Sequence, residues 1–314
     1  DESFSRAELV PEFLRAAETD GALLALPLRV QIMAAAGLTG VIGDGTEPMT
    51  AARALELLRA HPEAETLYYG ISGPELLAGL VCYGDYVDYA SGVCRFDSPE
   101  FSELLEICAR VQDGSARSWN DTVIREALES GRTLMNVESF AGVTDMQRFR
   151  ALYGDGFSLT GIAGGDGAPA AFADGRLGIL ASSEQLQDAW RFVRFSLERE
   201  NASNGIGFPM LRRELDRMLA ESSRAIYDVQ GERCPLLVIS GEDFQLELYE
   251  ATQDDLAAVR ALLSRVHRFA AQDETLVGIL TEETGAYFAG AKSAEDTAAV
   301  LQNRVSIYLA ENRK

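Results

Sequence analysis

Apolar residues recur at the spacing of an α-helix in several stretches of this chain. Within residues 50–59, Ala54, Leu55 and Leu58 fall on one face, and Pro62 ends the helix that they predict. Capping residues or a proline mark the starts of further helices at 97–100, 182–185, 209, 252, 273 and 293. Gly290 is the expected stop between the last two, so the C-terminal third is predicted to be helical.

Two of these helices show which residues they should bury. After the cap at 97–100, the residues predicted to face the core are Phe101, Leu104, Leu105 and Cys108. After the cap at 182–185, they are Ala189, Trp190, Val193 and Phe195.

Short runs rich in β-forming residues lie between the helices. They cover residues 23–33, 66–72, 132–137, 157–163, 176–181 and 236–239. Because strands alternate with helices, the pattern predicts an α/β fold with a mixed β-sheet, flanking helices and a helical C-terminal region. The Gly-rich stretch 161–175 is expected to be a loop.

Composition narrows the function classes. The chain has 314 residues, of which 47% are hydrophobic and 25% charged, so we expect a globular protein of two lobes. Its formal net charge of -21 argues against binding to nucleic acid or to anionic lipid. No stretch has the roughly 18 apolar residues of a membrane helix. The N-terminal residues do not resemble a signal peptide, and we expect that such a segment was removed.

Catalytic and metal-binding motifs are absent from the sequence. His61 and His267 do not stand at metal-ligand spacing, and neither Ser72 nor Ser240 lies in a Gly-x-Ser-x-Gly motif. We therefore predict that the protein is not an enzyme and uses no metal or cofactor. The four cysteines do not form a disulfide framework; Cys82 and Cys94 are either free thiols, which we favour, or a pair in an exported protein.

Aromatic and polar residues gather in the predicted loops at strand ends. These residues are Tyr83, Tyr86, Trp119, Glu138, Phe140 and Phe208. Rings that cover an apolar face, next to groups that bind hydroxyls, are typical of a site for a sugar or a similar polar ligand. The alternative is that about half of them are packing residues.

Four segments, in collinear order, resemble the bacterial extracellular solute-binding protein family 1, the substrate-binding lipoproteins of ABC transporters. Residues 131–140 read Gly-Arg-Thr-Leu-Met-Asn-Val-Glu-Ser-Phe, like the family strand that runs into the ligand cleft. Residues 20–27 and 176–192 resemble the two crossings between the lobes, although Leu24 stands where the family often has Tyr. Residues 287–308 resemble the helical tail of some relatives.

The resemblance implies a type II periplasmic-binding-protein-like fold with a hinge at the two crossings. The first crossing arrives by residue 27, so most of the first lobe is expected to be missing. On this basis residues 1–29 and 173–203 are a remnant of the first lobe with the hinge crossings. Residues 30–172 and 204–314 are the second lobe with its helical tail.

The same resemblance implies ligand-binding roles for Arg29 and Gln31 after the first crossing, for Glu138 and Phe140 at the strand end, and for Phe208 after the return crossing. Arg29 would pair with the ligand and Phe140 would stack on it. Tyr83, Trp119 and Asp273 are added from loop chemistry alone. In the alternative interpretation, Arg29 only offsets the acidic surface.

The implied partners are a small polar ligand, with a sugar favoured, and the membrane permease subunits of an ABC importer. The implied location is extracellular, at the cell surface, with a membrane anchor in the full-length parent. A homodimer through the exposed first-lobe remnant, around residues 9–14 and 193–195, is a further expectation. The alternative function is a non-catalytic interaction or scaffold module of a larger surface lipoprotein.

Overall fold

Strand β2, Arg29–Leu38, connects the two compact units of the chain. Unit 1 comprises Asp1–Met33, Ser139–Asp155 and Pro169–Phe269, and unit 2 comprises Ala34–Glu138, Gly156–Ala168 and Ala270–Lys314. This computed structural model describes residues 4–18, 21–83, 86–111, 120–163, 166–173, 175–202, 205–240, 245–270 and 273–312. The units follow packing, whereas the lobe boundaries given above follow the resemblance and remain a prediction.

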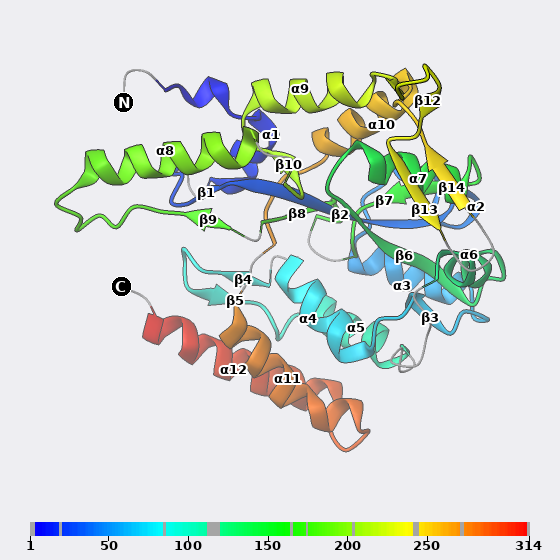
Figure 1. Cartoon of the computed structure of the whole chain (residues 1–314). Helices are drawn as coiled ribbons and strands as arrows, with labels where there is room; N and C mark the ends of the chain where they lie inside the picture. The colour runs from blue at the N-terminus through cyan, green and yellow to red at the C-terminus, as the bar shows by residue number, and fades with distance from the viewer. Residues whose placement is uncertain are drawn as a thin grey trace. The chain divides into compact units, whose positions relative to one another are not determined.

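Unit 1 is built around the first half of β2. This half pairs antiparallel with β8, Ala170–Phe172, and with β10, Phe208–Pro209, while β1, Leu26–Pro27, pairs antiparallel with β9, Arg176–Leu177. The helices of this unit are η1 (Arg6–Glu8), α1 (Pro11–Ala17), α7 (Val143–Tyr153), α8 (Leu186–Ala202), α9 (Arg212–Ser222) and α10 (Gln253–Ser264). Helix α8 runs alongside β9 (Figure 1).

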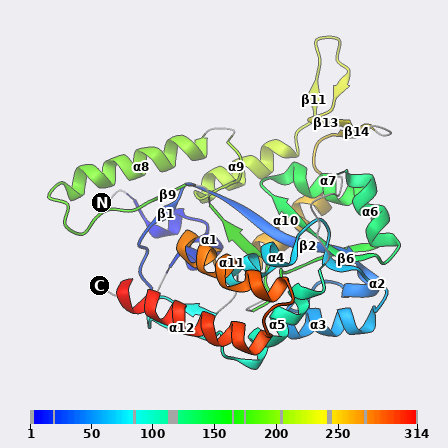
Figure 2. The same ribbon diagram turned by 90° about the horizontal axis from the view of Figure 1, so that it is seen from below.

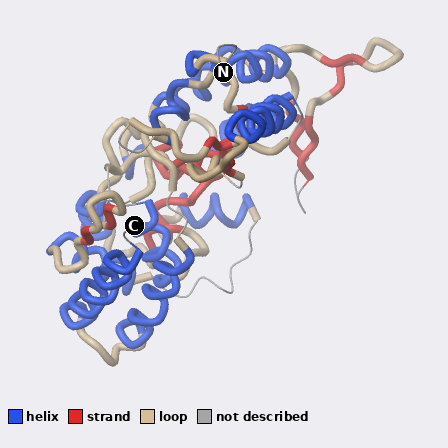
Figure 3. The backbone as a smooth tube through the Cα atoms, turned by 90° about the vertical axis from the view of Figure 1, so that its left-hand side faces the viewer, coloured by secondary structure: helices blue, strands red, loops and turns tan. Residues whose placement is uncertain are grey.

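Two small hairpins complete unit 1. Strands β11 (Ile226–Tyr227) and β12 (Arg233–Cys234) form the first, and β13 (Leu237–Ser240) and β14 (Gln245–Leu248) the second. The first hairpin projects from the helices of its own unit (Figures 2 and 3). Its residues are largely exposed, so the core of unit 1 lies instead between β2, α7, α9 and α10.

Unit 2 contains a mixed sheet. The second half of β2 pairs antiparallel with β7, Phe157–Thr160, and β3, Thr66–Tyr68, pairs parallel with β6, Thr133–Phe140, which ends in unit 1. A short hairpin joins β4, Val87–Asp88, to β5, Val93–Cys94. The helices are α2 (Thr39–Ile42), α3 (Ala51–Ala60), α4 (Gly73–Tyr83), α5 (Pro99–Ala109), α6 (Asp121–Glu129), α11 (Glu274–Phe288) and α12 (Ala294–Asn312).

The C-terminal helices of unit 2 form a helical pair. Helices α11 and α12 pack against each other, and they also contact α4 and α5 respectively (Figure 2). Gly290 adopts a φ of 72° directly after α11, a conformation that favours glycine, and the chain turns there into α12. The predicted mixed sheet with flanking helices and a helical C-terminal region is therefore confirmed.

Several helices with a capping signal begin where the sequence predicts. Ser98, Thr252 and Asp273 each accept a hydrogen bond from a backbone N–H of the first turn of α5, α10 and α11. All four residues predicted to be buried on α5 are in the core. The elements that were not predicted are helices η1, α1, α2, α4, α6 and α7 and strands β4, β5, β8, β10, β11, β12 and β14.

The Gly-rich stretch 161–175 is not a loop throughout, because Ala170–Phe172 within it forms β8 and pairs with β2.

Two further local predictions are wrong. Pro209 does not begin a helix, because it pairs with Arg29 in β10 and α9 begins only at Arg212. Phe195 does not belong to the buried stripe of α8, since 56% of it is exposed while Val193 is buried. The pattern could not tell which of two apolar faces on this helix meets the core.

Candidate functional site

Segments distant in the sequence form a pocket of about 420 Å³ inside unit 1. Strand pairing places Arg29 of β2 opposite Pro209 of β10. The other walls are the junction between β6 and α7 and one face of α9. The lining residues are Arg29, Ala141, Gly142, Val143, Thr144, Asp145, Gly205, Ile206, Pro209, Glu214, Arg217, Met218, Glu221 and Ser222.

Arg29, one of the predicted ligand-binding residues, lines this pocket. Its Nε donates a hydrogen bond to the backbone oxygen of Glu200 at 3.0 Å, and Nη1 donates to the backbone oxygen of Gly207. Partial burial lowers the pKa of Arg29 from its ordinary value, and the negative charge of Glu200 opposes that shift. The two carbonyls hold the guanidinium in one orientation at the pocket wall.

The pocket wall carries charges of both signs. Arg217 Nε donates to Glu214 Oε2 at 2.7 Å, and its Nη1 lies 3.2 Å from Glu221 Oε1. The Asp145 carboxylate accepts from the backbone N–H of Ala141 at 2.7 Å and of Gly142 at 3.0 Å, at the start of α7. Mixed donors and acceptors suit an uncharged ligand with several hydroxyl groups better than a multiply charged ion.

Neither Phe140 nor Phe208 lines this pocket, and none of its lining residues within the described part of the chain is aromatic. Phe140 is only 1% exposed and packs against Phe149, with 6.2 Å between the ring centroids; Phe208 is 0% exposed. Along the end of β6, exposure alternates, so Ser139 rather than Phe140 faces outward. In this structure, therefore, Phe140 and Phe208 are core residues and Phe140 does not offer a face for stacking.

Gln31 lies on β2 and Glu138 on β6, and each side chain accepts a hydrogen bond. Ser139 Oγ donates to Gln31 Oε1 at 3.3 Å, within unit 1. Glu138, in unit 2, is buried and accepts from Asn136 Nδ2 at 2.7 Å. Ser139 is not among the predicted site residues, although the period-2 alternation along β6 indicates that it faces outward.

The other two loop candidates fall at the limits of the described chain. Tyr83 is the last residue of α4, and its side chain lies outside the described residues, as does the whole of Trp119. Tyr86, also singled out for its chemistry, is buried and packs at 5.4 Å from Phe101. Their ligand-binding roles stay predictions.

Asp273 accepts hydrogen bonds from several segments of unit 2. It caps α11, accepting from the backbone N–H of Leu276 at 2.9 Å, and its Oδ2 accepts from the hydroxyls of Tyr89 at 2.8 Å and Tyr308 at 3.0 Å. Burial and the bond to Asp273 raise the pKa of both phenols. One carboxylate thus joins the turn after β4 to α11 and α12, a role that loop chemistry did not indicate.

We expect Asp273→Ala to lower the free energy of unfolding of unit 2 by about 2 kcal/mol, because it removes a helix cap and two side-chain partners. Asp273→Asn should lose less, since asparagine is also a good cap. Urea denaturation followed by circular dichroism measures both, with the exposed Glu295→Ala on α12 as the control. An equal, small loss in all three variants would contradict the structural role.

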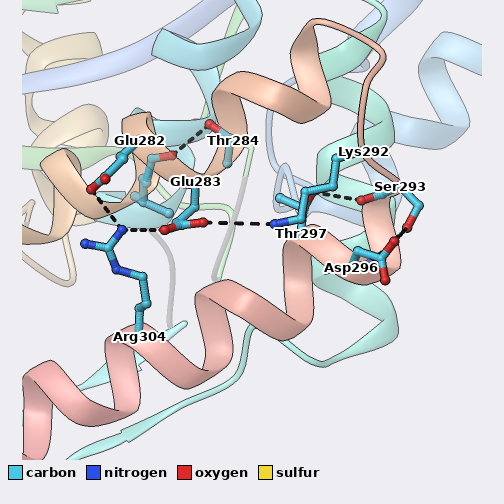
Figure 4. Close-up of polar contacts among 9 residues, drawn as sticks. Glu282, Glu283, Thr284, Lys292, Ser293, Asp296, Thr297 and Arg304 are labelled. Atoms are coloured by element: carbon cyan, nitrogen blue, oxygen red, sulfur yellow. Dashed lines mark hydrogen bonds and ion pairs between the residues drawn. The ribbon is translucent and has the colours of Figure 1, made fainter.

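Acidic side chains also link α11 to α12 (Figure 4). Arg304 Nη1 lies 2.8 Å from Glu282 Oε2 and also pairs with Glu283, while Lys292 Nζ is 4.0 Å from Glu283 Oε2. Ser293 accepts from the backbone N–H of Asp296 at the start of α12. Glu282 and Glu283, two adjacent carboxylates of α11, thus form ion pairs with basic residues of α12 and of the turn before it.

Cys82, Cys94, Cys108 and Cys234 are free, and burial raises the pKa of the Cys82, Cys94 and Cys108 thiols. Among the described residues, no three His, Cys, Asp or Glu side chains are grouped to hold a metal ion. No described helix is long and apolar enough to span a membrane.

No known protein-family model matches the sequence, and no curated protein matches it. Solved structures share its fold. The sugar-binding protein MalE from the phytopathogen Xanthomonas citri is 15% identical, with a TM-score of 0.55 over 98% of this chain and 76% of that chain. The ABC substrate-binding protein Lmo0181 from Listeria monocytogenes, in complex with cycloalternan, is 14% identical, with a TM-score of 0.51 over 99% and 78%.

A third solved structure is described as extracellular solute-binding protein family 1. The extracellular solute-binding protein family 1 member from Alicyclobacillus acidocaldarius is 10% identical, with a TM-score of 0.50 over 97% of this chain and 76% of that chain. The alignment covers nearly the whole chain in each case and includes both units. The chain therefore has the type II periplasmic-binding-protein-like fold of the bacterial extracellular solute-binding proteins, as its sequence predicts.

Proposed function

We propose that this chain binds a small polar solute, with a carbohydrate favoured, as the extracellular binding component of an ABC importer. The observation that carries the proposal is the fold shared with sugar-binding MalE over 98% of the chain. In this role the protein would hand its ligand to a membrane permease and catalyse no reaction. Its expected place is the cell surface, through an anchor in the full-length parent.

The chemistry of the pocket in unit 1 supports the same class of ligand. Its wall offers the Arg29 guanidinium, carboxylates and a serine hydroxyl beside short apolar groups such as Val143 and Ile206. Hydroxyl groups of a sugar can donate to the carboxylates and accept from the arginine. We assign Arg29 the main contact, since its orientation is already fixed by two backbone carbonyls before any ligand arrives.

The test is a thermal-shift screen against mono- and oligosaccharides, amino acids and polyamines, followed by calorimetry. One sugar class should raise the melting temperature by several degrees. Arg29→Ala should weaken its binding about 10-fold or more, because a hydrogen bond to a charged group is worth about 1.5–3 kcal/mol.

Arg212→Ala is the matched control for this variant. Arg212 is exposed on α9 in the same unit and does not line the pocket, so the change of net charge is the same. Its ligand affinity should equal that of the unmodified protein. If Arg29→Ala binds as tightly as Arg212→Ala, the ligand does not occupy this pocket.

A second candidate function is an interaction module of a larger surface protein. The burial of Phe140 and Phe208 favours it, because these two rings do not present a face to a sugar. A flat ligand screen on protein that circular dichroism shows to be folded would contradict solute binding and leave the interaction module as the explanation.

A further inference from the structure

Helix α8 has two apolar stripes on opposite faces. The inner stripe includes Val193 and Leu197, which are buried in unit 1. The outer stripe includes Phe192 and Phe195, of which 61% and 56% are exposed. A helix that only covers the core needs one stripe, so the second requires another explanation.

Charged residues extend the outer stripe at both ends. Asp188, Phe192, Phe195 and Arg199 follow one another at spacings of four, three and four residues. At about 100° per residue, they fall within an arc of about 60° and extend along roughly 16 Å of helix. All four are exposed, so one continuous strip carries an acid, two aromatic rings and a base.

The order of these residues makes the strip complementary to itself. Phe192 and Phe195 lie equally far from the midpoint between Val193 and Arg194, and so do Asp188 and Arg199. If a second strip runs antiparallel about a two-fold axis at this midpoint, each Phe192 meets the partner's Phe195 and each Asp188 meets the partner's Arg199. The spacing of four and three residues is also that of helices that pack side by side.

We propose that the outer stripe of α8 is a homodimer interface, in which α8 packs antiparallel against α8 of a second copy of this chain. Charge complementarity argues for a second copy as the occupant, because a partner with a uniformly charged helix would leave one end repelled. The surface shares Phe195 with the one expected from the sequence, but Leu9 and Val193 of that expectation are buried.

The contacts that Asp188 and Arg199 make within the chain do not prevent either side chain from pairing with a second copy. Arg191 Nη1 lies 2.8 Å from Asp188 Oδ1, but both side chains are largely exposed and such a pair is worth little. Arg199 lies over the Phe195 ring at 6.0 Å, on the same face. A single helix pair is a small interface between two chains of net charge -21, so the dimer should be weak and should form more readily when salt screens that repulsion.

Sedimentation velocity over a concentration series tests the proposal. The unmodified protein should show a monomer–dimer equilibrium, and replacing both rings (Phe192→Glu with Phe195→Glu) should raise the dissociation constant about 100-fold or more. The double variant also has to keep the circular dichroism spectrum of the parent, which is expected because both rings lie on the outer face.

Charge reversal supplies the sharper test. Asp188→Arg and Arg199→Asp should each be monomeric where the parent dimerises, since each brings like charges together twice. Mixed together, the two variants should form a heterodimer, because every pair across the axis is again opposite in charge. Asp188 and Arg199 of one chain are about 16 Å apart, so recovery cannot come from within a chain.

Three outcomes would overturn the proposal: a monomer at every concentration, a dimer that survives the loss of both rings, or two charge variants that fail to associate when mixed. None of these variants changes a residue that lines the pocket of unit 1, so each should bind solute as the unmodified protein does. If the protein binds solute but is monomeric at every concentration, the dimer proposal is wrong and the proposed function is unaffected.

Discussion

Phe101→Ala is expected to lower the free energy of unfolding of unit 2 by about 4 kcal/mol, the largest effect of any single change considered for this chain. Phe101 is 0% exposed, and its ring centroid lies 4.8 Å from that of Phe96 and 5.4 Å from that of Tyr86. Truncation removes these edge-to-face contacts and leaves a cavity beneath α5 that the rigid neighbours cannot fill.

Urea denaturation followed by near- and far-ultraviolet circular dichroism measures the loss. Phe101→Leu should cost less, because leucine refills much of the cavity. Ile307→Ala is the control in the same unit, since Ile307 is exposed on α12 and should change stability by no more than about 0.5 kcal/mol. A loss for Phe101→Ala as small as that of the control would mean that the aromatic cluster is not packed as described.

Asp255→Ala is expected to cost about 3 kcal/mol at neutral pH, because it leaves several donors without their acceptor. Asp255 is the third residue of α10, and its Oδ2 accepts from the backbone N–H of Thr252 at 2.8 Å and from the Thr252 hydroxyl at 2.7 Å. The other oxygen pairs with Arg150 of α7. The carboxylate therefore caps one helix and joins it to another.

The cost of Asp255→Ala should depend on pH. Burial by itself raises the pKa of Asp255, but the hydrogen bonds from Thr252 and the charge of Arg150 outweigh it, so the pKa is lowered overall. A carboxyl with a lowered pKa stabilises the folded protein above its unfolded pKa of about 3.9, and this contribution is lost as the pH falls through the folded pKa. The stability difference between parent and variant should shrink below about pH 4.

Two variants separate this effect from general acid unfolding. Asp255→Asn cannot ionise, so its difference from Asp255→Ala should stay constant with pH. Asp254→Ala removes an exposed neighbour and should behave like the parent. A difference between parent and Asp255→Ala that does not change between neutral and acidic pH would contradict the paired carboxylate.

Local signals in the sequence were sufficient for much of the fold. A cap is made by a side chain and a backbone N–H only two or three residues away, which is why Ser98, Thr252 and Asp273 mark their helices correctly. The alternation of strands with these helices indicated the α/β class, and the four collinear segments indicated the solute-binding fold that the solved structures share.

The candidate site was less predictable. Arg29 was identified from its place after a crossing strand, but the pocket beside it depends on α7, a helix without a recognised signal, and on α9. Asp273 was proposed as a ligand contact, yet its partners Tyr89 and Tyr308 stand far away in the sequence and meet it only in the folded unit. Spacing along a chain carries no information about such long-range partners.

What the sequence by itself determined, then, is several of the helices with local caps, the α/β class and the family that the chain resembles, because each depends on short segments of neighbouring residues. Only the tertiary structure decided which apolar side chains are buried. Phe140 and Phe195 are the same residue type at equally plausible positions, but one packs on Phe149 and the other faces solvent. Burial depends on what lies across the core, and that is set by contacts between segments distant in the chain.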